Sequence, residues 1–278
     1  MKKLKVILSV LIVAVLALGV FAACGGNDTT DTNTDADADV KTLVMATNAA
    51  FPPYEYKDGD SFKGIDVELA ELIAEKLGMK LEIADVEFGT IVGGVQTGKF
   101  DIGMAGMTVT EERLESVNFS NSYAKGVQSV IVKEGSDLTV FDDVYSAFDD
   151  EGNPTALKDG IKIGVQQDTT GDIYCSSAVK DWGVGEENVV RFKTGADAVQ
   201  ALVSGKVSAV VIDNEPAKSF VAANEGLKIL DTAYTEEDYA IAVAKENTEL
   251  LDNINAALKA LTEEGKVAEI IEKYIPAE

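Results

Sequence analysis

The chain has 278 residues, 46% of them hydrophobic and 26% charged, with a formal net charge of −24. This balance is typical of a folded globular protein and excludes a disordered one. The negative charge keeps a protein soluble and repels nucleic acid, so we expect no nucleic-acid partner. Histidine is absent, which excludes histidine-based acid–base catalysis and most zinc or copper sites. We therefore expect no metal and no cofactor.

Residues 1–23 have the features of an export signal: three lysines precede an apolar run over residues 6–20, and Phe-Ala-Ala leads directly to Cys24. This ending resembles a lipobox, after which cleavage would leave Cys24 lipidated at the start of a membrane-tethered protein. A plain transmembrane anchor is the alternative, because the apolar run is nearly long enough to span a bilayer. The composition of residues 24–40 predicts a flexible acidic tether. Lipidation of Cys24 leaves Cys175 alone, so we expect no disulfide and a small, buried Cys175 on a helix.

From residue 41 onward short apolar strands alternate with amphipathic helices, which predicts an α/β fold with largely parallel sheets. The first strand is expected at residues 42–46, and Asp58-Gly59 predicts a hairpin turn. A helix is expected to follow, capped by Asp66 and ended by Gly78, with one apolar face made of Val67, Ala70, Ala74 and Leu77. The acidic segment over residues 132–160 contains several turn signals and predicts an irregular surface excursion.

Two stretches of the chain are similar to each other: IVGGVQTGKFDIGMAG over residues 91–106 and AVQALVSGKVSAVVID over residues 198–213. Each predicts a helix, a Gly-Lys turn and a strand. The strands end in small or polar residues, at 105–106 and at 213–214, and ligands of open α/β sheets bind beyond such strand ends. Two similar lobes that share one cleft would explain the repeat, and chance similarity of short stretches is the alternative.

Only two arginines occur in the chain, Arg113 and Arg191. Arg113 falls in the first turn of a helix that Thr110 is expected to cap, where a cation opposes the helix dipole. Helix stability therefore does not explain this arginine, whereas a ligand with a carboxylate group would, because a guanidinium matches a carboxylate in shape and charge. The alternative is a surface ion pair with Glu111, Glu112 or Glu115.

Asp213 ends the apolar strand expected over residues 209–212, so its carboxylate should have little water around it and require a cation. If Arg113 binds a carboxylate from one lobe and Asp213 binds an ammonium from the other, together they recognise an α-amino acid zwitterion. The alternative role of Asp213 is to cap the helix that begins near Pro216.

Five motifs follow one another along residues 41–278: ATNAAFPPY (46–54), KGIDVEL (63–69), AGMT (105–108) with the later Glu112-Arg113, GVQQDTTG (164–171) and VID (211–213). In this order they resemble the family 3 solute-binding proteins of polar amino acid ABC importers. The resemblance implies a two-lobed periplasmic-binding-protein type II fold with a hinge of two strands, near residues 123–128 and 235–239. Lobe 1 would comprise residues 41–126 and 236–278, and lobe 2 residues 127–235.

The resemblance also implies a function. The chain would be a monomeric, non-enzymatic binding protein that delivers a free amino acid to an ABC permease with its ATPase subunits. It would be lipid-anchored at the outer face of the cytoplasmic membrane, on the cell surface of a Gram-positive organism or otherwise in the periplasm. The alternatives are an enzyme of the dehydratase type on the same fold, with Asp213 or Glu55 as acid or base, and a ligand sensor.

Individual site residues follow from the same resemblance. Arg113 would bind the ligand carboxylate, with further hydrogen-bond donors at Gly106, Thr108, Thr169 and Thr170. The ligand ammonium would be accepted by Ala105 and Asp213. The ligand side chain would lie between the aromatic rings of Phe51 and Phe88 and contact Asn48 and Gln166. Ordinary core packing is the alternative for both phenylalanines.

Two residues depart from the family pattern. Asn48 stands where several relatives carry an aspartate, and Asp168 replaces the glycine expected before Thr169. The first change leaves the side-chain end of the pocket without a counter-charge, so we expect an uncharged polar amino acid as ligand. Glu55 is an acid that could still reach the pocket and favour a cationic ligand.

Overall fold

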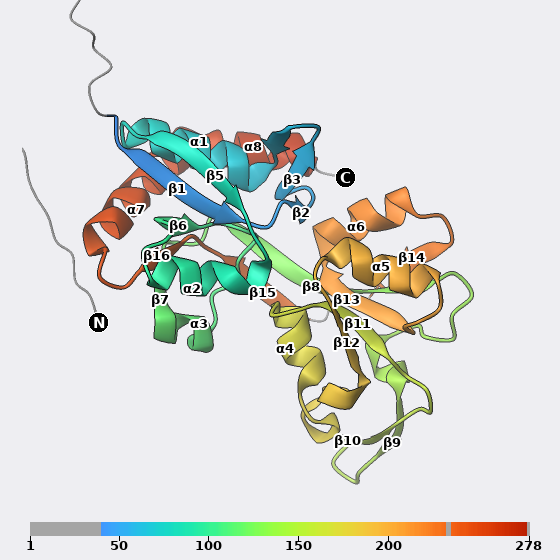
Figure 1. Ribbon diagram of the computed structural model, residues 1–278. Helices are drawn as coiled ribbons and strands as arrows, with labels where there is room; N and C mark the ends of the chain where they lie inside the picture. The colour runs from blue at the N-terminus through green and yellow to red at the C-terminus, as the bar shows by residue number, and fades with distance from the viewer. Residues whose placement is uncertain (1–39, 232–234, 277–278) are drawn as a thin grey trace, which may run out of the picture. The chain divides into compact units, whose positions relative to one another are not determined.

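The computed structural model describes residues 40–231 and 235–276 (Figure 1). The predicted signal peptide, Cys24 and all but the last residue of the predicted tether lie outside these residues. Within the described ranges no helix has the length and apolar character needed to cross a membrane.

The first sheet has five strands in the order β5 (Lys80–Asp85), β1 (Thr42–Thr47), β6 (Ile102–Gly103), β16 (Ala242–Ala244) and β7 (Val117–Phe119). Strands β5, β1 and β6 are parallel, as the alternating pattern predicts, and β16 joins antiparallel to β6 and β7. A small antiparallel sheet of β2 (Ala50–Phe51), β3 (Glu55–Asp58) and β4 (Ser61–Lys63) follows β1, and its Asp58-Gly59 turn confirms the predicted hairpin.

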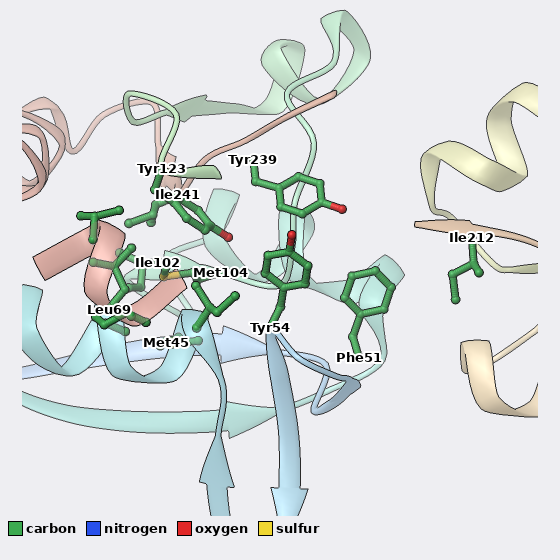
Figure 2. Packing of buried hydrophobic residues seen from close by; sticks show 14 of the residues in the cluster. Met45, Phe51, Tyr54, Leu69, Ile102, Met104, Tyr123, Ile212, Tyr239 and Ile241 are labelled. Carbon is green, nitrogen blue, oxygen red and sulfur yellow. The ribbon is translucent and has the colours of Figure 1, made fainter. Parts of the chain in front are cut away.

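Helices cover both faces of this sheet because successive side chains of a strand point to opposite faces. Leu43 and Met45 of β1 belong to the core formed with α1 (Ile65–Lys76), α7 (Thr248–Glu263) and α8 (Lys266–Tyr274). Ala46 faces the other way and packs with α2 (Ile91–Gln96). Figure 2 shows part of the first core, in which Met45 and Ile102 of the sheet lie close to Leu69 of α1.

The second sheet has the order β12 (Val189–Phe192), β11 (Ile163–Gln166), β13 (Ala209–Asp213), β8 (Ala124–Lys133) and β14 (Leu227–Ile229). Helices α5 (Gly195–Val203) and α6 (Asn214–Ala223) pack on one face, with Val210 and Ile212 of β13 beneath them. Helix α4 (Thr170–Ser176) packs on the other face, where Cys175 is fully buried as the sequence predicts.

Two neighbouring strands connect the sheets. The chain passes from β7 to β8 and returns from β15 (Thr235–Tyr239) to β16. Strands β8 and β15 pair antiparallel from Thr235 opposite Gln128 to Tyr239 opposite Ala124. These are the residues expected for the two hinge strands, and the exact lobe boundaries stay a prediction.

The internal repeat has the same local structure in both copies. Helix α2 is followed by Gly98 and β6, and helix α5 is followed by Gly205 and β13. Both glycines have positive φ angles, 71° and 75°, which end each helix at the same point. The prediction of a helix, a turn and a strand in each copy is confirmed.

Two local predictions were wrong. Asp66 does not cap α1: the helix begins at Ile65, and the backbone N–H groups of Ile65 and Asp66 donate to the carbonyls of Pro53 and Tyr54. Gly64, with a φ of 125°, permits this approach, because a Cβ there would lie 2.1 Å from the Tyr54 carbonyl oxygen. The acidic segment over residues 132–160 is also more regular than expected, since it contains the hairpin of β9 (Tyr145–Phe148) and β10 (Pro154–Leu157).

Candidate functional site

A cavity with about 310 Å³ of empty space lies where residues of both sheets meet. It is lined by all eleven side chains and backbone groups that the sequence predicts for the site, together with Glu55: Asn48, Phe51, Glu55, Phe88, Ala105, Gly106, Thr108, Arg113, Gln166, Thr169, Thr170 and Asp213. The first eight come from the part of the chain that builds the first sheet, and the last four from the second. Their role as ligand contacts stays a prediction, but their convergence on one cavity is a property of the fold.

The aromatic wall near β2 depends on a glycine. Phe51 stacks beside Tyr54, with ring centroids 6.0 Å apart, and Tyr54 meets Tyr239 edge to face at 5.1 Å (Figure 2). Gly106 has a φ of 52°, and a Cβ added there would lie 2.9 Å from the Phe51 ring. Only glycine therefore fits where the β6 strand end passes this ring. Phe51 is also part of the core, so packing and cavity wall are both roles of this residue.

Arg113 lies in the first turn of α3 (Glu111–Ser116), whose N-cap Thr110 accepts the Arg113 backbone N–H as predicted. The side chain is only 8% exposed, so the alternative of a surface ion pair is wrong. Its Nη1 donates to the Thr108 carbonyl at 2.7 Å and its Nη2 to the Asp168 carbonyl at 3.1 Å. The guanidinium also lies over the Phe88 ring, 5.2 Å from the centroid. Both carbonyls are neutral acceptors, which leaves the cationic charge available to an anion in the cavity.

Asp213 lies at the end of β13 and is 7% exposed. It occupies the N-cap position of α6, but its side chain makes no capping hydrogen bond, so that alternative is wrong. The Tyr239 hydroxyl donates to it instead. Burial, reinforced by repulsion from Glu237, raises the pKa of Asp213 to about 7. A cation beside this carboxylate would relieve both costs of ionisation.

Glu55, which the sequence offers only as an acid that could still reach the pocket, lines the cavity. Glu55 is 1% exposed, and its carboxyl group hydrogen bonds with Asp66. The Oε2 atom of this carboxyl has no hydrogen-bond partner. Burial, followed by repulsion from Asp66, raises the pKa of Glu55 well above its ordinary value. Asp66 in turn accepts the Gly106 N–H and the Tyr123 hydroxyl, both at 2.8 Å. Asp66 thus holds the Gly106 backbone that borders the cavity, and burial together with repulsion from Asp66 favours the neutral form of Glu55.

Amide side chains join the two sides of the cavity. The Gln166 Nε2 donates to Asn48 Oδ1 at 2.9 Å, and Asn48 Nδ2 donates to the Val86 carbonyl at 2.8 Å. Asn48 follows β1 and Gln166 ends β11, so this contact links the two sheets. Thr169 caps α4, and its hydroxyl donates to the Gln166 carbonyl at 2.8 Å.

Asp168 has a left-handed conformation, with a φ of 65°. This explains why a glycine is expected there, and aspartate is among the few other residues that adopt it readily. The conformation turns its carbonyl toward Arg113 and lets its N–H donate to Asp172 at 3.1 Å. Its carboxylate approaches Gly89 so closely that a Cβ on Gly89 would lie 2.0 Å from Asp168 Oδ2.

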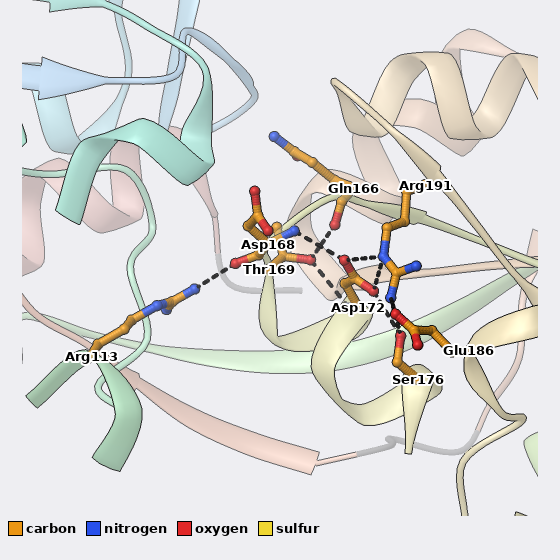
Figure 3. A network of polar contacts seen from close by, with 8 residues as sticks. All are labelled: Arg113, Gln166, Asp168, Thr169, Asp172, Ser176, Glu186 and Arg191. Atoms are coloured by element: carbon orange, nitrogen blue, oxygen red, sulfur yellow. Dashed lines mark hydrogen bonds and ion pairs between the residues drawn. The ribbon is translucent and has the colours of Figure 1, made fainter. Parts of the chain in front are cut away.

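The second arginine supports this loop from outside the cavity. Arg191 Nε donates to both carboxylate oxygens of Asp172 at 2.9 Å, and its Nη2 donates to Ser176 at 2.8 Å. Figure 3 shows Asp172 between Arg191 and the loop of residues 166–169, with Arg113 reaching that loop from the opposite side. The two arginines thus have different environments: Arg113 meets neutral carbonyls, and Arg191 is already neutralised by Asp172.

Two buried residues behind the cavity were not predicted for the site. Glu237 of β15 and Gln128 of β8 are both buried and hydrogen bond to Thr108 and Thr170. The alternation along β15, where Glu237 and Tyr239 are buried, is a sequence signal for Glu237 but not for Gln128. Over residues 40–231 and 235–276, no group of three histidine, cysteine, aspartate or glutamate side chains is arranged to hold a metal ion.

Residues 43–277 match the family described as bacterial extracellular solute-binding proteins, family 3. The chain belongs to this family. The match covers nearly the whole described region, so the family and the two-lobed α/β fold predicted from the five motifs are confirmed.

Several known proteins are similar to this chain over most of its length. The ABC transporter glutamine-binding protein GlnH of Bacillus subtilis is 28% identical over 99% of this chain and 100% of its own. An ancestral arginine-binding protein bound to arginine is 38% identical, with a TM-score of 0.74 over 84% of this chain and 98% of that chain. An ancestral arginine-binding protein bound to glutamine is also 38% identical, with a TM-score of 0.73 over 85% of this chain and 98% of that chain. An ancestral amino acid-binding protein, a precursor of cyclohexadienyl dehydratase, is 30% identical with a TM-score of 0.72 over 84% of this chain and 95% of that chain.

Proposed function

We propose that the chain is the substrate-binding protein of an amino acid ABC importer and encloses one free L-amino acid between its lobes. The observation that carries this proposal is the pair of opposite charges in one buried cavity, Arg113 from the first half of the chain and Asp213 from the second. A ligand that bears both a carboxylate and an ammonium satisfies both groups at once, whereas a simple anion or cation satisfies only one. The amino acid ligands named for the relatives support the same class.

The cavity favours an uncharged polar side chain. The side-chain end carries the amides of Asn48 and Gln166, and burial favours the neutral form of the Glu55 carboxyl by raising its pKa. With Glu55 neutral, the charges of Arg113 and Asp213 balance those of a zwitterion and leave no charge over. Glutamine, which the ancestral relative accepts, fits this description.

A cationic ligand is the competing class, because Glu55 has an unpartnered oxygen in the cavity wall and an ancestral arginine-binding relative has been solved with arginine. A guanidinium or ammonium beside Glu55 would favour its ionised form and so supply the missing counter-charge. The two classes thus differ in the protonation of one residue. Replacement of Glu55 by Gln should leave the affinity for an uncharged ligand within about threefold and weaken that for a cationic ligand by about 30-fold or more.

Calorimetric titration of the purified protein with the twenty amino acids tests both levels of the proposal. Saturable one-to-one binding of glutamine, asparagine or a similar amino acid is the expected result, and tight binding confined to arginine and lysine would replace the uncharged class by the cationic one. If none of the twenty binds, the proposed function is wrong. Native mass spectrometry of freshly purified protein provides an independent check, since a retained ligand adds its own mass.

Closure follows from the same contacts. An open form offers either Arg113 or Asp213 to the ligand, and only the closed form offers both, so the ligand selects closure. The closed form is the one an ABC permease with its ATPase subunits would recognise. Lipidation at Cys24 would keep the protein at the outer face of the membrane, and the intact mass of the membrane form tests that attachment.

An enzyme of the dehydratase type is the second candidate, favoured by the raised pKa of Asp213 and by the relative that is a precursor of such an enzyme. The proposal of a non-enzymatic binding protein predicts that prolonged incubation with any bound amino acid returns it unchanged. Appearance of a product, followed by mass spectrometry and lost in Asp213→Asn, would establish the enzyme instead.

A further inference from the structure

Glu237 is a buried acid on a strand of exposed acids. Its side chain is 5% exposed, whereas its neighbours Glu236 and Asp238 on β15 are exposed. The Thr108 hydroxyl donates to Glu237 Oε2 at 2.8 Å, and the Gln128 Nε2 donates to the same oxygen at 3.2 Å. The Tyr174 side chain also hydrogen bonds with Glu237. A carboxylate costs free energy when buried, so its presence among these partners indicates a specific role.

The contacts of Glu237 continue into the second lobe. Gln128, which is fully buried, also donates to the Thr170 hydroxyl at 3.3 Å. The hydrogen bonds therefore run from Thr108 beside the first sheet, through Glu237 on β15 and Gln128 on β8, to Thr170 at the start of α4. Both end residues line the cavity, and both middle residues lie on the two strands that join the sheets.

These hydrogen bonds determine which group the hydroxyl proton of each threonine can reach. The Thr108 hydroxyl donates to Glu237, so Thr108 can offer a ligand only its backbone N–H. The Thr170 hydroxyl accepts from Gln128, so its own proton stays available to a ligand carboxylate. The orientation of both donors thus depends on the acceptor at Glu237.

The charge of Glu237 also acts on both charged groups of the cavity. Among the carboxylates near Arg113, it is the one that most favours the cationic form, ahead of Asp213. It is also the charge that most opposes ionisation of Asp213. The other titratable groups that face Asp213 are Tyr54, Glu55, Arg113, Tyr174 and Tyr239.

We propose that Glu237 is a positioning residue of the binding site, which anchors Thr108 and, through Gln128, Thr170 to the joining strands and sets the charge that Asp213 faces. The proposal rests on the proposed function, since it concerns capture of an amino acid in the cavity. No contact between Glu237 and the ligand is required.

The test compares Glu237→Gln, Glu237→Ala and the exposed control Glu236→Gln, which removes the same charge from the same strand. Calorimetry with L-glutamine and L-arginine as probes is run from about pH 5 to about pH 9, and the probe that binds the wild type is used throughout. Glu237→Gln keeps an acceptor for both donors, so binding should persist, but the midpoint of the pH profile should move down by about one unit because the like charge beside Asp213 is gone. Glu237→Ala loses the hydrogen bonds to Thr108, Gln128 and Tyr174 and should bind about tenfold more weakly at every pH.

Glu236→Gln should match the wild type in affinity and midpoint. The proposal is overturned if Glu237→Gln has the wild-type midpoint, or if Glu237→Ala has the affinity of the control. If Glu237→Ala does not fold, Thr108→Val tests the same contact from the lobe 1 side, and an unchanged affinity there would again overturn it. If the wild type and the control bind neither these probes nor any other amino acid, the proposed function fails as well.

Discussion

Replacement of Arg113 by Ala is the most direct test of the cavity. The guanidinium is almost fully buried, and its hydrogen bonds to Thr108 and Asp168 use neutral carbonyls, so solvent screens its charge little. Loss of one member of a desolvated charge pair costs about 2–5 kcal/mol. At about 1.4 kcal/mol for each factor of ten, this corresponds to about 30- to 5,000-fold weaker binding.

Arg191 provides the matched control for this prediction. Arg113→Lys and Arg191→Lys make the same chemical change, but Arg191 is already paired with Asp172 and does not line the cavity. Arg113→Lys should weaken binding by about tenfold or more because a lysine cannot match the carboxylate with a planar fork. Arg191→Lys should change the affinity by less than about threefold. Titration calorimetry measures the affinity of each variant, and an unchanged circular dichroism spectrum shows that the variant is folded. An Arg113→Ala protein that binds as tightly as the wild type would show that Arg113 is not part of the site.

Three further predictions follow from pKa shifts and backbone geometry. Burial and the charge of Glu237 raise the pKa of Asp213 to about 7, and a ligand ammonium favours the ionised form, so affinity should fall as the pH drops below about 7. Asp213→Asn should abolish tight binding and remove this pH dependence. A carboxylate whose pKa is raised in the folded state destabilises that state at pH values above its unfolded pKa. The Asn variant should therefore have a higher Tm than the wild type at about pH 8 when no ligand is added. Asp168→Ala should lower the free energy of unfolding by about 1 kcal/mol relative to Asp168→Gly in urea titrations, since only the glycine adopts the left-handed conformation without strain; equal midpoints would contradict this. Burial raises the pKa of the Cys175 thiol, so a Cys24→Ser protein should react with a thiol reagent only after unfolding, and fast reaction of the native protein would show that the thiol is accessible.

Sequence reasoning succeeded where a local pattern has one structural outcome. Thr110 three residues before Arg113 predicts a capped helix, and the structure contains it. The glycines of the two repeated stretches end both helices, and the strand ends that follow reach one cavity. The residues around that cavity were predicted through the family motifs, because local sequence alone leaves two roles open for Arg113 and Asp213, ligand binding or an ordinary surface or capping contact.

The residues that sequence reasoning missed depend on tertiary contacts. Glu237 is one of 48 acidic residues, and only the alternation along β15 distinguishes it from exposed acids. Glu55 was named as an acid that could reach the pocket, but its burial beside Asp66 is visible only in the fold. Asp66 precedes an apolar helical stretch and so resembles a cap, but backbone carbonyls of the preceding loop already satisfy the helix start, which leaves its carboxylate free to accept the Gly106 N–H.

The pairing of Ala124 with Tyr239 at the start of β8 and the end of β15 places both ends of the intervening segment side by side. The chain therefore leaves the first lobe near residue 124 and returns to it near residue 239, at the same place. A segment with adjacent termini can be inserted into a host domain without altering the host's chain path. The architecture is thus that of one domain interrupted by another, in which the inserted half could be exchanged between homologues as a unit while the host half keeps its connections.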